Sequence, residues 1–400
     1  MEIFLLAILI YIVNITVGYA TSKYLKIPWM LTAVLFGMAL SSFGLFGNVM
    51  ESENFQFLSK MGLVFFLFTI GIEIEVEQFR KLGRYIAVGD VLLTLTEGSL
   101  LALFFYFAFP EFVSNSFVVA LVCGIAFGTV GEVVLLAILE EFGLVKTRFG
   151  QLALGIGVFD DIFEVLALSI IVILPTLTFG GSQKVVWGDL LTTMLTLSGL
   201  LIVTILLSQT GKYTRRYLEK VQNDSFVIPF MIFMVIFSFI FFGSRGFEGM
   251  GVVAAIFSGI AVKQVLPEKF VQQYKKPIYF IGNIFLGPFF FLSLGGKMSL
   301  GNLLSYPLLV LVIIAISLFS RISVSYLLFN KILGKRQSLV MGVGLTTKFS
   351  TSIVSESILL SSGLIAAPLY SGIMIAFIVL KPIIIVVFSR SLASIKGEVQ

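Results

Sequence analysis

The sequence contains no histidine and a single cysteine, Cys123, and only 12% of its 400 residues are charged. Without histidine, catalytic triads that use an imidazole, histidine-ligated zinc sites and histidine pH switches are excluded. One cysteine excludes a disulfide framework and a thiolate metal site. Soluble domains carry about 25% charged residues, and half that charge cannot cover a soluble particle of this size. We therefore exclude a soluble enzyme, a nucleic-acid-binding protein and a disordered chain.

The chain is instead rich in apolar residues, which make up 58% of it and include 42 phenylalanines. An apolar helix of about 20 residues spans the hydrocarbon core of a bilayer. The sequence therefore predicts an all-α polytopic membrane protein, a single membrane domain over 1–400 without a soluble regulatory domain. Charged and Gly- or Pro-bearing breaks divide it into thirteen transmembrane helices, placed at 3–21, 27–46, 58–76, 86–109, 115–140, 150–174, 188–208, 225–243, 247–263, 277–296, 306–329, 337–361 and 368–389. The first has no basic n-region and no cleavage site, so we expect a retained helix rather than a signal peptide.

The basic residues of the loops predict how these helices are oriented. With the N-terminus outside, the inner loops and the C-terminal tail hold most of the 27 lysines and arginines, and the outer loops hold Lys60, Lys184, Arg245 and Lys297. Basic residues concentrate in cytoplasmic loops. We therefore expect a multi-pass protein of the cell (plasma or inner) membrane, with the N-terminus outside and the C-terminus in the cytoplasm. The net charge of +5 is then a topology signal rather than a nucleic-acid footprint.

An odd number of spans predicts two halves of opposite orientation. Residues 1–174 form a first six-helix repeat, 188–208 a linker helix and 225–389 an inverted second repeat. Inverted repeats are common in secondary transporters, whose substrate sites are formed by discontinuous helices. Two matching spans, the fifth and the twelfth, carry Gly and Thr near their middle together with a charge, GIAFGTVGE at 124–132 and GVGLTTK at 342–348. These two spans are therefore predicted to be discontinuous.

Charged side chains at the depth of the bilayer centre are the strongest indication of a functional site. Such a charge costs at least about 2.5–3.5 kcal/mol to insert, so it is a functional hypothesis by default. Those placed within the spans are Asp160, Asp161, Glu132, Arg321 and Lys348 near the midplane, Glu164 one turn beyond the aspartates, Glu356 two turns beyond Lys348, and Glu97 in the middle of its span.

The adjacent Asp160 and Asp161 are the most specific of these signals, because neighbouring like charges are a poor way to stabilise a helix. In a poorly solvated cavity two carboxylates do not readily ionise together, so the pair holds either protons or a hard cation. This exclusivity is the chemical basis of cation:proton exchange. We therefore expect Asp160 and Asp161 to bind a monovalent cation or protons, with Glu164, Glu132 and Thr129 extending the site.

The remaining charged and hydroxyl groups of the spans have matching roles. Discontinuous helices leave partial charges at half-helix ends, which Glu132 and Lys348 can compensate. Arg321 stays protonated and can pair with the first aspartate or with another carboxylate. Thr346 and Thr347 offer hydroxyl or backbone ligands.

Several of these residues also have a purely structural interpretation. Glu132 and Lys348 can form a simple ion pair, Arg321 can be a static tether, and Glu164 can line a pore without binding the ion. We interpret Glu97 as structural, and Asp90 as a residue that caps or snorkels near the inner end of its span.

Four segments resemble a known family. They are MGLVFFLFTIGIEIEVEQFR at 61–80, LEEFGLVKTRFGQLALGIGVFDD at 139–161, PFFFLSLGGKMSL at 288–300 and the helix that begins at 335. Together they resemble the cation:proton antiporter superfamily, in its branch of bacterial NapA-type sodium/proton and Kef-type potassium/proton antiporters. The resemblance extends over all thirteen spans, and the paired aspartate is its most specific element.

The resemblance implies a panel (dimer) domain and a core domain that moves against it like an elevator, in a homodimer. It also implies that the two discontinuous helices cross near the aspartates. Asp161 corresponds to the essential cation- and proton-binding carboxylate, and Asp160 to a position that is Asp in electrogenic members and Asn in many electroneutral ones. Arg321 stands where electrogenic members carry a lysine, and Lys348-Phe349-Ser350 replaces the family's Arg-Gly-Glu.

The expected function is secondary active exchange of a monovalent cation for protons, with Na⁺ or Li⁺ as the cation. We expect no cofactor. The expected partners are the transported ions and the lipid bilayer. Three alternatives stay open: a K⁺/H⁺ antiporter of the Kef type, a sodium-coupled symporter of an organic anion, and a channel. The adjacent aspartates disfavour the symporter, and the lack of a selectivity-filter repeat disfavours the channel. An enzyme is the least favoured class, because the chain has no nucleophile and base set.

Overall fold

The computed structural model describes residues 2–25, 29–73, 83–130, 135, 138–139, 142–145, 147–157, 159–160, 171, 187–218, 226–245, 250–298, 301, 305–348 and 351–399. Regular secondary structure in these ranges is helical, as the sequence predicts. Among the described residues, seven helices are long and apolar enough to cross a membrane: Glu2–Tyr24, Glu53–Ile72, Tyr85–Ala108, Met194–Gly211, Glu268–Gly296, Pro307–Leu333 and Ala367–Leu392. Shorter apolar helices, such as Phe117–Phe127 and Ser352–Ser361, accompany them.

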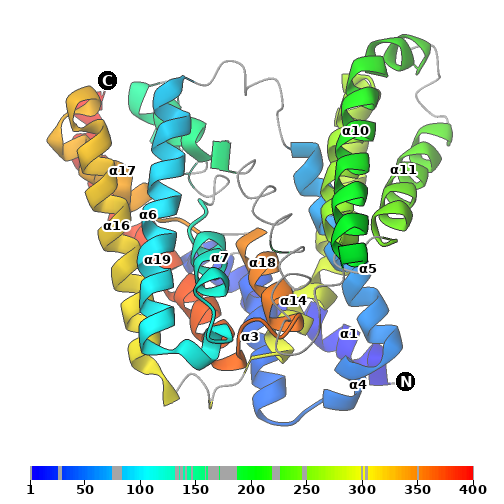
Figure 1. The fold of residues 1–400 in the computed structure, drawn as a ribbon, viewed down its shortest axis with the longest axis horizontal. Helices are drawn as coiled ribbons and strands as arrows, with labels where there is room; N and C mark the ends of the chain where they lie inside the picture. Colours follow the sequence, from blue (N-terminus) through cyan, green and yellow to red (C-terminus); the bar gives the residue numbers. More distant parts are fainter. Residues whose placement is uncertain are drawn as a thin grey trace.

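The helices pack in two groups. In Figure 1 the first group includes the helices of residues 187–243 on the right, the second includes those of residues 307–344 on the left, and the two groups overlap in the middle of the view. The first group is formed by the N-terminal helices and by the middle of the chain. It contains α1 (Glu2–Val13), α2 (Tyr19–Leu25), α3 (Trp29–Ser42), α4 (Gly47–Glu51), α5 (Glu53–Glu73), α10 (Trp187–Leu218), α11 (Val227–Gly243), α12 (Met250–Val265), α13 (Glu268–Tyr279), α14 (Gly287–Gly296) and the π-helical turns η1 (Asn14–Gly18) and η4 (Phe280–Leu286).

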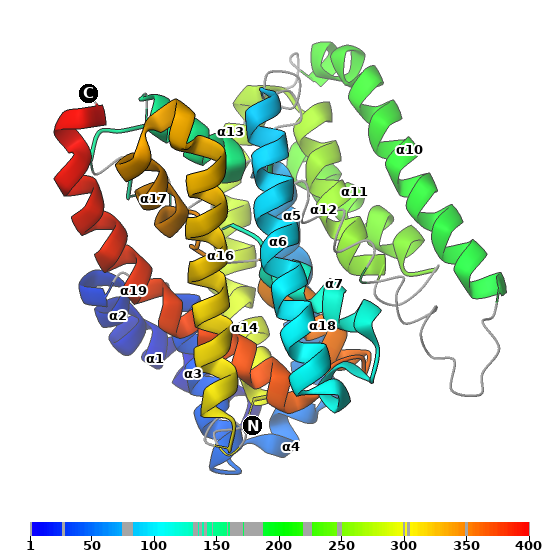
Figure 2. The same cartoon turned by 60° about the vertical axis from the view of Figure 1, so that its left-hand side comes forward.

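The second group joins the helices around residue 100 to the C-terminal part of the chain. It contains α6 (Arg84–Ala108), the 3₁₀ turn η3 (Pro110–Val113), α7 (Phe117–Phe127), α16 (Pro307–Leu333), α17 (Lys335–Gly344), α18 (Thr351–Ser361) and α19 (Ala367–Val399). α6 and α16 stand side by side in both views, and α7 lies against α6 and α18 (Figure 2). Most of the polar residues discussed below lie on these helices or just beyond their ends.

Close packing of α7 on α6 depends on two glycines. A Cβ atom at Gly124 would lie 2.3 Å from the carbonyl oxygen of Gly98, and a Cβ at Gly98 would lie 2.9 Å from the backbone of Ile125. Small residues let membrane helices approach each other closely. The pair therefore sets how near the end of α7 comes to α6.

Both spans that carry Gly and Thr at their middle are interrupted in the structure. α7 starts at a Ser116 cap, whose hydroxyl accepts the Val119 N–H, and ends at Phe127, with Thr129 and Val130 outside the helix. α17 ends at Gly344, and α18 resumes the same span at Thr351. The interruptions expose backbone groups at the centre of the second group.

Several helices extend beyond the predicted spans, three of them by nine residues or more. α10 continues to Leu218 rather than ending at 208, α13 begins at Glu268 ahead of the span predicted from 277, and α19 reaches Val399 rather than 389. The apolar pattern reports the hydrocarbon thickness, whereas the helices continue through polar sequence such as GKYTRRYL, where water and headgroups solvate the side chains. The two ends of the chain lie at opposite ends of the helices in Figures 1 and 2.

Candidate functional site

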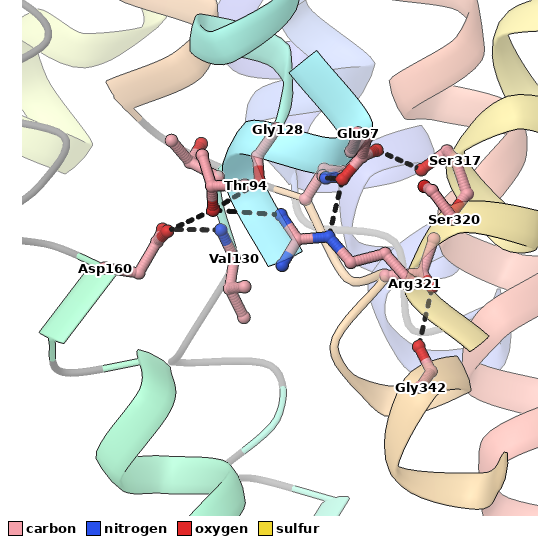
Figure 3. Close-up of polar contacts among 12 residues, drawn as sticks. Thr94, Glu97, Gly128, Val130, Asp160, Ser317, Ser320, Arg321 and Gly342 are labelled. Carbon is pink, nitrogen blue, oxygen red and sulfur yellow. Dashed lines mark hydrogen bonds and ion pairs between the residues drawn. The ribbon is translucent and has the colours of Figure 1, made fainter. Parts of the chain in front are cut away.

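One face of α6, a mainly apolar helix, carries three buried polar residues. Asp90, Thr94 and Glu97 follow one another at spacings of four and three, which places them on the same side of a helix. All three are fully buried. This polar face of α6 is turned toward α16 and toward the end of α7, as Figure 3 shows for Thr94 and Glu97.

Glu97 accepts hydrogen bonds from two basic residues. Arg321 Nε of α16 lies 2.5 Å from Glu97 Oε2, and Lys348 Nζ from the break between α17 and α18 lies 2.7 Å from the same oxygen. The hydroxyl of Ser317 donates to Glu97 Oε1 at 2.5 Å. Charge-assisted hydrogen bonds are the strongest kind in proteins, so Glu97 ties α6, α16 and the break together.

Asp160 lies on the other side of Thr94 (Figure 3) and is fully buried. The N–H of Val130, just past the end of α7, donates to Asp160 Oδ2 at 2.6 Å, and the Thr94 hydroxyl donates to Oδ1 at 3.3 Å. The carboxyl group of Asp90 lies beside it. Arg321 approaches only as far as Thr94, with Nη2 3.4 Å from the Thr94 hydroxyl. In this arrangement Asp160 is held by neutral donors, and the guanidinium is bound to Glu97.

The described part of the break between α17 and α18, residues 345–348, places Lys348 beside an aromatic ring. Its ammonium group lies 5.2 Å from the centre of the Phe127 ring, a cation–π distance. The hydroxyls of Thr346 and Thr347 each donate to a carbonyl of the last turn of α17, those of Gly342 and Gly344, at 2.8 Å. Both threonines are buried, and their hydroxyls satisfy carbonyl groups that the end of a helix leaves open.

The end of α7 also meets the start of α18. The Thr129 hydroxyl contacts the Ser352 hydroxyl, and it also lies 3.4 Å from the carbonyl oxygen of Ala126. Both side chains are buried. Thr129 and Val130, next to each other, therefore link α18 to the backbone that holds Asp160.

Three of the predicted site residues, Asp161, Glu164 and Glu132, lie outside the described residues. The structure brings the others together. Asp160, Thr129, Arg321, Lys348, Thr346 and Thr347 all lie at the two breaks or on the helices beside them.

Two details differ from the sequence-based predictions. In the structure Lys348 is bound to Glu97, whereas the sequence suggests Glu132 as its partner. Asp90 is buried rather than snorkelling to the surface. Of the two partners left open for Arg321, the first aspartate or another carboxylate, the structure has the second, Glu97. The spacing of Asp90, Thr94 and Glu97 places these three side chains on one face of α6, but it does not name their partners.

A comparison of the sequence with known protein families identifies the family of this chain. The family described as "Sodium/hydrogen exchanger, transmembrane" matches residues 7–390, nearly the whole chain. The chain belongs to this family. The exchanger is therefore a multi-pass membrane transporter of the Na⁺/H⁺ antiporter kind and not an enzyme. Family membership sets aside the symporter and channel alternatives.

Curated relatives of the exchanger carry matching names. It is 25% identical over 360 residues to "Probable Na(+)/H(+) antiporter 3" of Methanocaldococcus jannaschii, covering 87% of this chain and 86% of the relative. It is 23% identical over 392 residues to "Na(+)/H(+) antiporter" of Enterococcus hirae, covering 95% and 96%. "Na(+)/H(+)-K(+) antiporter GerN" of Bacillus cereus is 24% identical over 360 residues, covering 88% and 86%.

A solved structure has the same fold. The exchanger superposes on the sodium proton antiporter MjNhaP1 from Methanocaldococcus jannaschii, solved at pH 8, with a TM-score of 0.63 and 17% identity. The match covers 100% of this chain and 98% of the other. The exchanger is thus an all-helical polytopic membrane protein with the fold of that antiporter.

Proposed function

We propose that this exchanger moves Na⁺ or Li⁺ against H⁺ at a site centred on Asp160 and Asp161. The observation that carries the proposal is the division of charge around α6. Glu97 binds both Arg321 and Lys348, whereas Asp160 accepts from a backbone N–H at 2.6 Å and a hydroxyl at 3.3 Å, with the carboxyl group of Asp90 beside it. A carboxylate held by neutral donors keeps its charge for an exchangeable ion, either H⁺ or an alkali cation.

The charges of the described site support competition between the two ions. Arg321 and Lys348 carry one positive charge more than Glu97 can offset, and that excess lies on the side of Thr94 opposite Asp160. It offsets part of the charge of the aspartates but not all of it. Two neighbouring carboxylates in a dry site do not stay ionised together without a cation. The aspartates must then lose protons before they bind Na⁺, and they must release Na⁺ before they bind protons again.

We further propose the inverted-repeat architecture and an elevator movement. Each predicted six-helix half contributes its first three spans to one group of helices and its described later spans to the other, as inverted repeats require. The two discontinuous spans, at 115–140 and 337–361, occupy matching positions in the halves. The second group would be the core that carries the ion, and the first the panel domain of a homodimer.

The decisive experiment is cation-dependent proton flux in proteoliposomes, read with an internal pH dye. We expect Na⁺-driven H⁺ movement by the wild type, and none by Asp161→Asn, which cannot alternate between proton and cation. Glu111→Gln removes an exposed carboxylate outside the membrane helices and should exchange like the wild type. Exchange that survives in Asp161→Asn would disprove the aspartate site, and its absence in the wild type would disprove the activity.

A second candidate, K⁺/H⁺ exchange on the same machinery, is favoured by one observation. The relative from Bacillus cereus is named as an Na⁺/H⁺-K⁺ antiporter. Hydroxyl and carboxylate ligands serve both alkali cations, so the site chemistry does not separate them. Parallel assays with Na⁺, Li⁺ and K⁺ gradients decide it. We expect Na⁺ and Li⁺ to drive proton flux, and a flux driven equally by K⁺ would favour the second candidate.

A further inference from the structure

A second buried carboxyl group lies away from the aspartates, where α7 packs on α18. Cys123 of α7 donates its thiol proton to Glu356 Oε2 at a distance of 3.3 Å. Both side chains are fully buried. Among the described residues, the other oxygen, Glu356 Oε1, has no hydrogen-bond partner. We call the contact of Cys123 with Glu356, together with the contact of Thr129 with Ser352, the α7–α18 seam.

Among the described residues, the charged groups nearest the seam are bound to other partners or lie further along their helices. α7 carries no charged residue, and Glu356 is the only one on α18. From α19, the buried Tyr370 faces Glu356, and Lys381 lies about three helical turns further along.

The basic residues that flank α18 are also engaged. Lys348, ahead of α18, is bound to Glu97. Lys297, at the other end, lies 2.9 Å from the Ser361 hydroxyl. In the described part of the chain, Glu356 therefore has no ion pair with a lysine or arginine.

An ionised carboxylate at this place would be an uncompensated charge at bilayer depth. Isolated buried charges are so costly that the group takes up a proton instead. A protonated carboxyl fits the contact, because its carbonyl oxygen accepts the thiol proton while its hydroxyl is Oε1. Burial without a described cation therefore favours a proton on Glu356 in this packing of α18 on α7.

We infer that Glu356 is a proton-binding site separate from the aspartates, and that loss of its proton loosens the α7–α18 seam. Ser352 lies one turn before Glu356 on α18 and contacts Thr129, which adjoins the Val130 N–H that holds Asp160. Opening of the seam at Glu356 consequently displaces Thr129 and the adjoining Val130 N–H, which binds Asp160. The inference does not depend on which cation is exchanged, or on exchange itself.

The lone cysteine makes the seam measurable on the purified full chain. A neutral maleimide modifies Cys123 only when the seam is open and the thiol is ionised. In the wild type both Glu356 and Cys123 must lose a proton, so the labelling rate rises about a hundredfold per pH unit below both midpoints. In Glu356→Gln only the thiol titrates, and we expect about a tenfold rise per pH unit. Glu111→Gln, the same change at an exposed site, should keep the wild-type slope.

Equal slopes in the wild type and Glu356→Gln would overturn the inference. So would a tenfold slope in the wild type, which decides the matter even if Glu356→Gln does not fold. A second readout is the infrared carbonyl band of protonated carboxyl groups. We expect Glu356→Gln to lose one such band at neutral pH, and an unchanged spectrum would contradict a protonated Glu356. Failure of the proposed exchange would leave both measurements interpretable, because neither uses transport.

Discussion

Glu97 is the residue on which the described site depends most, because one carboxylate binds two buried cations. Ion pairs in low dielectric are retained only when geometry and further hydrogen bonds are good, and removal of one partner is far more damaging than the pair is stabilising. Here Ser317 supplies the further hydrogen bond, and Lys348 also faces the Phe127 ring. Arg321 and Lys348 are both buried, so water cannot solvate their charges in place of Glu97.

Glu97→Gln should therefore destabilise the protein strongly. It leaves Arg321 and Lys348 without a carboxylate, a loss of about 3–5 kcal/mol for an unpaired buried charge. Thermal unfolding in detergent measures it. Ser317→Ala, which removes one neutral donor to the same carboxylate, should cost about 1 kcal/mol and serves as the control. Equal unfolding temperatures for Glu97→Gln and the wild type would contradict the charge cluster.

At the scale of elements, the site is created where helices stop. α7 ends at Phe127 and α17 at Gly344, and the backbone beyond each end supplies the Val130 N–H and positions Lys348. The position of α7 depends in turn on its glycine contact with α6. A small displacement of α7 should therefore shift the Val130 N–H and weaken its hydrogen bond to Asp160.

Gly124→Ala tests this coupling. Its Cβ would meet the Gly98 carbonyl oxygen at 2.3 Å, so α7 must move away from α6. Overpacking of this kind costs about 1–3 kcal/mol, and we expect a lower unfolding temperature together with weaker cation-induced stabilisation in a thermal-shift assay.

Gly199→Ala on α10 is the matched control, because a Cβ there meets nothing within 4 Å. It should be neutral or stabilising by about 0.5–1 kcal/mol. If Gly124→Ala behaved like Gly199→Ala, the contact between α6 and α7 would not position the site.

The sequence predicts the interruptions better than the contacts they create. Gly and Thr next to a charge in the middle of an apolar span indicate a broken helix, because glycine weakens a helix and a charge at this depth needs a partner, and the breaks lie where that pattern stands. The sequence does not predict helix ends such as Leu218, because hydropathy measures lipid thickness and not helix length. It leaves two partners open for Arg321 and does not give Glu97 as the partner of Lys348, because pairing depends on which helix faces meet, and a single sequence does not contain that information.

At the scale of the whole molecule, the chain ends lie at opposite ends of the helices. Termini at opposite ends are expected for any odd number of membrane crossings, and thirteen predicted spans is one such number. The distribution of loop lysines and arginines predicts the direction, with the N-terminus outside. Loops at the end shared with the C-terminus would then face the cytoplasm.

Impermeant maleimide labelling of intact cells tests that direction. A cysteine at Glu111, in the exposed turn after α6, should be labelled from outside. A cysteine at Lys335, exposed at the start of α17, should react only after permeabilisation. The reverse pattern would invert the topology, and wild-type cells, whose one thiol is buried, are the background control.

The burial of Cys123 between α7 and α18 also has a practical consequence for spectroscopy. At neutral pH the natural chain behaves as a protein without a reactive thiol, so paired spin labels can be placed at chosen surface positions without first replacing a native residue. Distances between a label on α10 and one on α16 would then report the separation of the two helix groups in liposomes, with sodium and without it.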